Sequence, residues 1–132
     1  MGLRYFGNSS TQVIGISVSA SRERLEERTS NVIGMISDVS AIPRGIVDDH
    51  EIIINDEYIG AGYGRPTDAG VAAMRTVAEN EGVILDPVYT GKAMSGMLDM
   101  IRRGALDNPR DVVFLHTGGA PAIHPYAEFL RT

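Results

Sequence analysis

The sequence predicts an α/β fold of three layers, with a mostly parallel sheet covered by helices. Short apolar runs rich in β-branched residues alternate along the chain with segments that repeat apolar residues at helical spacing. The strand-like runs are apolar throughout rather than at every second position, as expected of strands covered on both faces. This alternation of strands and helices is typical of a parallel sheet between two helical layers.

Length and composition narrow the class of protein. At 132 residues and 43% hydrophobic content, the chain is expected to form a single domain over residues 1–132, with one core. Only 6% of the residues are aromatic and none is Trp, so this core should be aliphatic. The net charge of -5 argues against binding to nucleic acid or to anionic membranes, because both need clustered basic residues.

Several kinds of chemistry lack support in the sequence. The absence of cysteine excludes disulfides, a thiolate nucleophile and a Cys-ligated metal. The three histidines, His50, His116 and His124, do not have metal-ligand spacing, so no metal site is expected. No apolar run approaches membrane-spanning length and no signal pattern opens the chain, so a cytoplasmic protein is expected.

The first half of the chain reads as strand, helix, strand. Residues 12–19, "QVIGISVS", form the first expected strand. An amphipathic helix should follow over residues 22–36, with Ser21 as its N-cap and charged residues on its other faces. Residues 51–58, "EIIINDEY", form the second expected strand, and three glycines then open a loop, "IGAGYGRP".

The second half continues the alternation. Pro66-Thr67 predicts the start of a helix, and Gly82 is its expected left-handed end. Residues 83–90, "VILDPVYT", return as a strand that Asp86-Pro87 perturbs. The next helix covers residues 91–104, with an Asp99–Arg103 pair at favourable spacing, and residues 111–119, "DVVFLHTGG", are the last expected strand.

Parallel sheets bind ligands beyond the carboxyl ends of their strands. The segments "YIGAGYG", "DPVYTGK" and "HTGGAP" each follow or end an expected strand, so they are expected to converge on one rim and form one site.

Each segment also has a structural explanation. On this explanation the "HTGGAP" turn only ends a strand, and the "YTGK" segment holds a packed Tyr and a capping Thr. The "GAGYG" segment lacks the dinucleotide-binding spacing and favours a flexible loop. His116 is expected to be a structural hydrogen-bonding residue. Lys92, the only lysine, is expected to be exposed at a helix N-terminus.

Three segments taken together resemble a known family. In order and spacing, "VIGISVS", "GYGRPTDAGVAAMRTVAENEGVILDPVYTGKAMSGMLDMIRRG" and "VVFLHTGGAPAI" are similar to the C-terminal part of the pyridoxal-phosphate (PLP) enzymes of the D-cysteine desulfhydrase and 1-aminocyclopropane-1-carboxylate (ACC) deaminase family. The resemblance extends from Gln12 to about Tyr126. It implies a fold similar to tryptophan synthase β, in which PLP is held between two α/β domains.

The resemblance also implies roles for individual residues. Tyr63 and Tyr89 stand where the family places catalytic tyrosines over substrate and cofactor, while Thr90, Thr117 and Gly118 stand at positions that contact the pyridine ring. Deaminases of the family carry Glu at the position of Thr90 and desulfhydrases carry Thr, so the chain looks more like a desulfhydrase. A neutral partner leaves the pyridine nitrogen unprotonated, which suffices to eliminate a thiolate from a β-carbon but is poorer for opening a cyclopropane.

The chain also departs from the family pattern. Members attach PLP through a lysine in an N-terminal "GNK" segment and bind its phosphate with a further loop, and neither has a counterpart here. Lys92 does not match that lysine, so covalent attachment of PLP is not expected.

The resulting hypothesis is a C-terminal segment of a D-cysteine desulfhydrase-like lyase, or of an ACC deaminase-like enzyme, acting on a small amino acid. Alone it should be inactive, with a complementing N-terminal chain providing the lysine. Missing strands would expose a sheet edge, so a homo-oligomer, most simply a dimer, is also expected. The alternatives are a non-catalytic α/β module that binds a small anion or a partner protein, and a truncated remnant.

Overall fold

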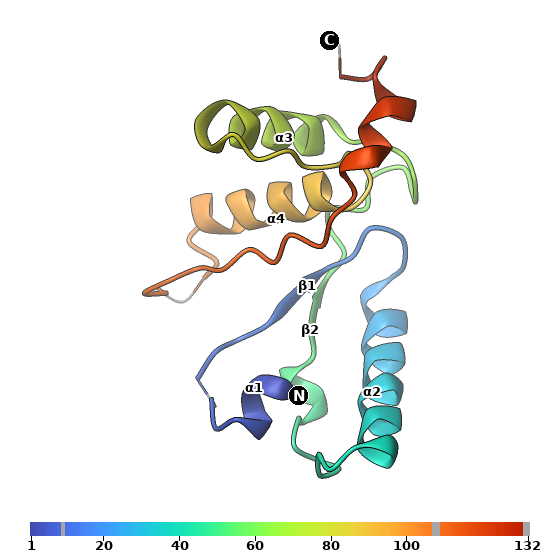
Figure 1. The fold of residues 1–132 in the computed structure, drawn as a ribbon, viewed down its shortest axis with the longest axis vertical. Helices are drawn as coiled ribbons and strands as arrows, with labels where there is room; N and C mark the ends of the chain where they lie inside the picture. The colour runs from blue at the N-terminus through green and yellow to red at the C-terminus, as the bar shows by residue number, and fades with distance from the viewer. Residues whose placement is uncertain (9, 107–108, 131–132) are drawn as a thin grey trace. The chain divides into compact units, whose positions relative to one another are not determined.

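The computed structural model describes residues 1–8, 10–106 and 109–130 (Figure 1). The chain divides into two compact units, Met1–Asp56 and Glu57–Thr132. The first unit contains the sheet and the second contains every residue that the sequence analysis places in a cofactor site. A single domain over the whole chain stays a prediction.

The first unit is a strand–helix–strand arrangement. β1 (Ile14–Ile16) and β2 (Ile53–Asn55) pair in parallel, with Ile14 opposite Ile53. A parallel pair needs a crossover connection, and α2 (Arg22–Val39) lies in that connection and packs against β2. The prediction of an α/β fold with a parallel sheet is therefore confirmed, although both strands are shorter than expected. Two short helices complete the unit, α1 (Gly2–Tyr5) and η1 (Asp49–Glu51).

The N-terminus of α2 is capped by a residue distant in sequence. Ser21 occupies the N-cap position as expected, but its side chain makes no capping hydrogen bond. Instead, the Asp56 carboxylate accepts a hydrogen bond from the Arg22 backbone N–H at 2.8 Å. Asp56 directly follows β2, so pairing of the two strands brings a negative charge to the positive end of the helix.

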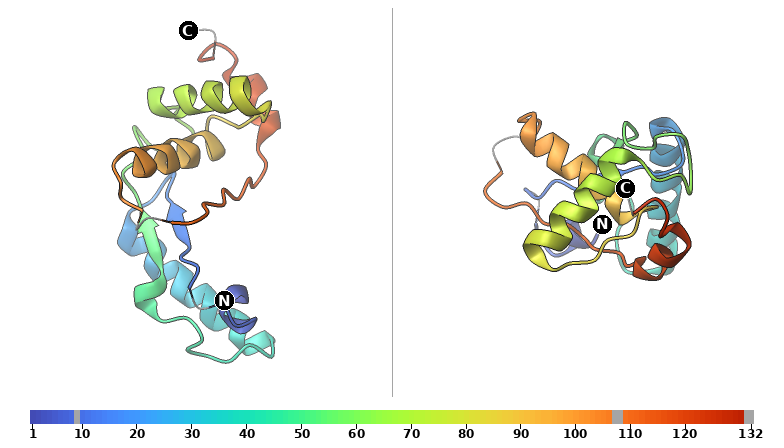
Figure 2. Two further views of the ribbon diagram at one scale, coloured as in Figure 1. Left: turned by 90° about the vertical axis from the view of Figure 1, so that its left-hand side faces the viewer. Right: turned by 90° about the horizontal axis from the view of Figure 1, so that it is seen from above.

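The second unit has two helices that lie side by side (Figures 1 and 2), α3 (Asp68–Glu81) and α4 (Thr90–Arg102). Both end signals predicted for α3 are confirmed. The Thr67 hydroxyl accepts from the Gly70 N–H at 3.0 Å, and Gly82 ends the helix with a left-handed φ of 66°. The Asp99–Arg103 ion pair on α4 also forms.

The core of the second unit lies between these helices. Ala73 and Met74 of α3, Met94 of α4 and Leu85 ahead of α4 form a buried cluster. Gly91 permits the close approach, because a Cβ there would lie 2.9 Å from the Met74 Cγ and 2.7 Å from the Asp86 carbonyl oxygen. The predicted aliphatic composition of the core is confirmed. Partly buried residues pack around this cluster: Val77, Met97, Phe114, Ile123 and Leu130.

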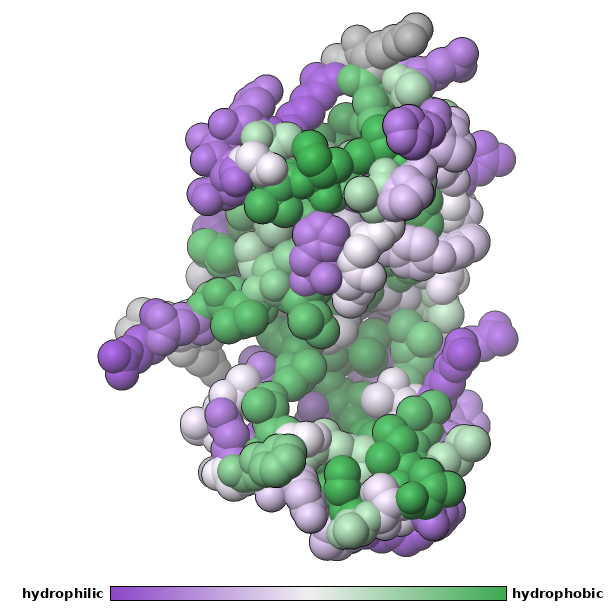
Figure 3. Space-filling view, viewed as in Figure 1, coloured by the Kyte–Doolittle hydropathy of each residue, from purple (hydrophilic) through white to green (hydrophobic). Residues whose placement is uncertain are grey.

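The predictions of a third and a fourth strand are wrong. None of the described residues in 83–90 or 111–119 belongs to a strand. A run of apolar residues becomes a strand only when its backbone pairs with a neighbour, and residues 111–119 belong to neither a helix nor a strand, with Val113 and Leu115 at 88% and 80% exposure. Figure 3 shows that apolar side chains are exposed on the face of the molecule seen in that view. After this segment the chain forms η2 (Ala120–Tyr126).

No helix within the described residues is both long enough and apolar enough to cross a membrane.

Candidate functional site

The site expected from the sequence falls within the second unit, on three loops rather than on three strand ends. The loops are residues 59–64, residues 84–89 ahead of α4, and residues 116–119 ahead of η2. Specific contacts join them. The His116 imidazole bonds the Ile84 carbonyl oxygen at 3.0 Å, and the hydroxyl of Tyr63 on the first loop bonds that of Tyr89 on the second.

Tyr63 and Tyr89 form an exposed aromatic pair. Their ring centroids are 5.9 Å apart and the ring planes meet at 64°, an edge-to-face arrangement. Both side chains reach solvent, with 61% and 43% of their area exposed. The hydrogen bond to Tyr63, with further contributions from desolvation and the charge of Asp86, raises the pKa of Tyr89, so its phenol stays protonated at neutral pH. The pair can therefore offer an O–H donor and two aromatic faces to a ligand.

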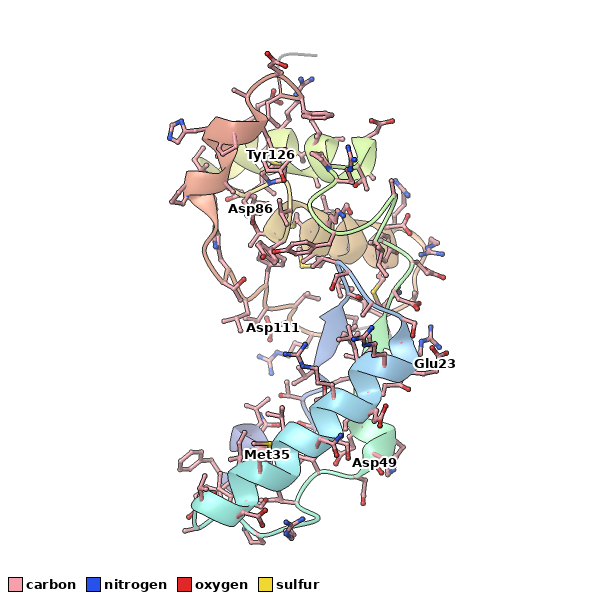
Figure 4. All side chains as sticks on the ribbon, turned by 90° about the vertical axis from the view of Figure 1, so that its right-hand side faces the viewer. Glu23, Met35, Asp49, Asp86, Asp111 and Tyr126 are labelled. Carbon is pink, nitrogen blue, oxygen red and sulfur yellow. The ribbon has the colours of Figure 1, made fainter. Side chains whose placement is uncertain are left out.

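Asp86 organises the loop that carries Tyr89. It is fully buried, and its two carboxylate oxygens accept four hydrogen bonds. One oxygen accepts from the backbone N–H groups of Val88 and Tyr89, both at 2.8 Å, and the other from the Thr90 N–H at 2.8 Å and the Thr90 hydroxyl at 2.7 Å. Burial acts to raise the pKa of Asp86, but the hydrogen bonds outweigh it and lower the pKa. Asp86 is thus an anion that fixes the turn into α4 (Figure 4).

Thr90 is buried beside this carboxylate. Its hydroxyl donates to Asp86 and accepts from the Asp86 backbone N–H at 2.8 Å. The role that the resemblance gives Thr90, a partner of the pyridine nitrogen, would require the hydroxyl proton to turn away from Asp86. This role stays a prediction.

The Gly-Gly turn is held by a histidine, as expected of a structural His116. The His116 Nδ1 accepts from the Gly118 N–H at 3.0 Å, so the proton of the neutral ring lies on Nε2 and is donated to the Ile84 carbonyl oxygen. Gly118 and Gly119 have φ values of 97° and 101°. A Cβ on Gly119 would lie 2.5 Å from an Asp86 carboxylate oxygen, whereas one on Gly118 would meet open space. Thr117 and Gly118 are exposed.

Lys92 is not exposed, contrary to expectation. It has 0% exposed area, and its Nζ donates to the carbonyl oxygens of Ile59 at 2.6 Å and Gly62 at 3.0 Å. The expectation came from its place in the first turn of α4, and it failed because the 59–64 loop covers that turn. Desolvation lowers the pKa of Lys92.

The 59–64 loop is accordingly tied down at both ends. Besides the two bonds from Lys92, the Tyr126 hydroxyl donates to the Gly64 carbonyl oxygen at 2.8 Å. Sequence reasoning overlooked Tyr126 and Asp86. The role of Asp86 could have been predicted, because Asp-Pro immediately ahead of a helix is a typical turn-and-cap pattern.

Within the described residues, no three His, Asp or Glu side chains gather in a way that could hold a metal ion.

Comparison with known proteins identifies the family. Residues 1–118 match the family model described as "Pyridoxal-phosphate dependent enzyme". The chain belongs to this family. The resemblance noted in the sequence is confirmed.

Individual members give a finer picture. ACC deaminase of Burkholderia vietnamiensis is 40% identical over 91% of this chain and 35% of its own length, and D-cysteine desulfhydrase of Salmonella newport is 39% identical over 87% of this chain and 34% of its own. The crystal structure of an ACC deaminase homologue superposes with a TM-score of 0.84 at 32% identity, over 98% of this chain and 38% of that one. The chain thus spans about a third of the length of these relatives.

The residues of this chain fit one side of a PLP site and not its covalent attachment. The exposed phenols of Tyr63 and Tyr89, the Thr117 hydroxyl and the open space at Gly118 suit non-covalent contact with a small ring and its substrate. The single lysine does not suit attachment, since its Nζ is buried and donates to two carbonyl groups.

Proposed function

We propose that residues 57–130 form the substrate-facing wall of a PLP site in a D-cysteine desulfhydrase-like lyase that acts on a small amino acid. The observation that carries the proposal is the exposed Tyr63–Tyr89 hydrogen-bonded pair, on loops joined to the Gly118–Gly119 turn. When bound, PLP supplies an electron-withdrawing ring that weakens bonds at the substrate α-carbon. The two tyrosines would orient the substrate and its leaving group against that ring.

The residue type of Thr90 supports one of the two activities of the relatives over the other. Identities of 40% and 39% are too close to separate a deaminase from a desulfhydrase. Thr90 brings a neutral hydroxyl to a position where the resemblance implies Glu in the deaminases, and this favours the elimination chemistry. ACC deaminase-like activity is the second candidate, on the strength of the relatives named above.

We further propose that the cofactor is anchored by a lysine outside this chain, so that the chain is inactive alone and needs a complementing chain. The burial of Lys92 supports this. Borohydride reduction of the chain with PLP, followed by mass spectrometry, should label the Met1 α-amine and leave Lys92 unlabelled. Sulfide release from D-cysteine by the purified chain alone would contradict the proposal.

Ligand binding tests the wall itself. NMR titration with PLP and with pyridoxine should shift the signals of Tyr63, Tyr89, Thr117 and Gly118, while inorganic phosphate should not. Substitution Tyr63→Phe should weaken PLP binding, and Tyr5→Phe, an exposed tyrosine of the first unit, serves as the matched control. A response to phosphate alone would favour a non-catalytic anion-binding module instead.

We also propose that the chain self-associates as a homo-oligomer, most simply a dimer. The segment 111–117 presents exposed Val113 and Leu115 and does not pair as a strand. Such a segment can pair with another chain. Sedimentation equilibrium should show a dimer, and a monomer mass at high concentration would contradict this.

A further inference from the structure

The position of the Lys92 side chain is energetically unfavourable for its charged ammonium group. The side chain has 0% exposed area, it lies in the first turn of α4, and the partial charge of a helix N-terminus is positive. Burial and the helix dipole therefore both disfavour the ammonium. Its two hydrogen-bond acceptors are neutral carbonyl oxygens, at 2.6 and 3.0 Å. A methionine of similar length would avoid both costs, so the ammonium calls for an explanation beyond packing.

Both acceptors belong to the loop that carries Tyr63. The Ile59 carbonyl lies at the start of this loop, and the Gly62 carbonyl belongs to the peptide bond that joins Gly62 to Tyr63. Gly60 and Gly62 have φ values of 67° and 129°, a region that other residues rarely enter. Glycines make this stretch conformationally free, so a specific tie is needed to hold it in one shape.

Lys92 belongs to α4, the helix whose N-terminus carries Tyr89. Tyr89 is the N-cap residue of α4, three positions before Lys92. A single ammonium thus connects the backbone that precedes Tyr63 with the helix turn that follows Tyr89. The edge-to-face contact and the hydroxyl hydrogen bond of the two tyrosines lie across this connection.

We propose that Lys92 is a positioning residue, whose buried ammonium holds the 59–62 backbone against α4 and thereby sets the geometry of the Tyr63–Tyr89 pair. It touches neither substrate nor cofactor. The use of the pair in binding rests on the proposed function, but the positioning itself does not. The two can therefore fail separately.

The test is Lys92→Met, with Arg102→Met as the matched control, because Arg102 is an exposed cation of the same helix with 77% of its side chain exposed. In the native chain and in R102M, NMR should show a cross-relaxation signal between the Tyr63 and Tyr89 rings. K92M should lose this signal, and the pKa of Tyr89 should fall toward its ordinary value as the Tyr63 hydrogen bond is lost. A folded K92M that keeps the ring contact would overturn the proposal.

If K92M does not fold, the positioning role of Lys92 can be tested in the native chain. Scalar couplings across hydrogen bonds should link the Lys92 Nζ to the carbonyl carbons of Ile59 and Gly62, and the ammonium protons should exchange slowly. An intact tyrosine contact without these couplings would overturn the proposal. The chain could instead show the tyrosine ring contact and the Lys92 couplings but no response to PLP. That result would count against the proposed function and would leave the positioning role of Lys92 intact.

Discussion

Replacement of Asp86 by Asn probes the turn that builds the site. The two side chains have the same shape, but one carboxylate oxygen becomes an NH₂ group. Each oxygen of Asp86 accepts two hydrogen bonds. In either orientation of the Asn side chain, its NH₂ group therefore faces two hydrogen-bond donors and cannot accept from them. The Asp86 side chain has no exposed area, so water cannot replace the lost acceptor.

The expected loss of stability follows from this count. A hydrogen bond to a charged group contributes about 1.5–3 kcal/mol, and two of the four are lost. The Thr90 hydroxyl can turn to relieve one conflict, so the lower end applies, and Asp86→Asn should lower the free energy of unfolding by about 3 kcal/mol. This is a large part of the roughly 5–15 kcal/mol that stabilises a typical domain.

The effect should also depend on pH. Since the pKa of Asp86 is lowered in the folded chain, its stabilising contribution is complete above the unfolded pKa of about 3.9 and is lost as pH falls through the folded value. The difference between the native chain and D86N should therefore shrink on acidification. A difference that grows at low pH would contradict the assigned charge state.

Urea unfolding followed by tyrosine fluorescence measures this difference. The chain has five tyrosines and no tryptophan, and four of the tyrosines lie in the second unit with Asp86. The matched control is Asp111→Asn, the same change at a side chain that is 84% exposed in segment 111–117 of that unit (Figure 4), with an expected effect within about 0.5 kcal/mol. A loss below about 1 kcal/mol in D86N, that of a single ordinary hydrogen bond, would refute the reasoning.

Three further substitutions test other parts of the second unit. Thr67→Ala removes the acceptor for the Gly70 N–H and should cost about 1 kcal/mol in urea unfolding, while Thr67→Ser should restore most of it. Gly82→Ala forces a Cβ into a left-handed φ of 66° and should cost roughly 1 kcal/mol, and a neutral result would mean that α3 ends differently. Gly119→Ala places a Cβ 2.5 Å from an Asp86 oxygen, so calorimetry should show weaker PLP binding than in Gly104→Ala, a control glycine that also has a positive φ but has open space around it.

Local sequence signals predicted the helices well. Thr67 and Gly82 bound α3 as expected, and the pair of Asp99 and Arg103 forms on α4. The interactions concerned join residues three or four positions apart, which a sequence displays directly. Asp86 could have been read in the same way, since all the hydrogen-bond donors to its carboxylate lie within four residues.

Strand formation and side-chain burial could not be predicted from such local signals. The apolar segments 83–90 and 111–119 resemble strands, yet a strand exists only where a neighbour pairs with its backbone. Ser21 had the right residue type for a cap, but Asp56, 34 residues from Arg22, makes the capping hydrogen bond. In each case a partner distant in sequence decided the outcome.

The sequence alone thus determined the main helices, the parallel strand–helix–strand unit and the family, and it predicts which residues would face a PLP ring. Only the tertiary structure decided that Tyr63 and Tyr89 share a hydrogen bond and that Lys92 is buried. The physical reason is that the solvation of a side chain depends on which loop covers it. Lys92 meets the carbonyl groups of Ile59 and Gly62, 33 and 30 positions earlier, only once the chain has folded.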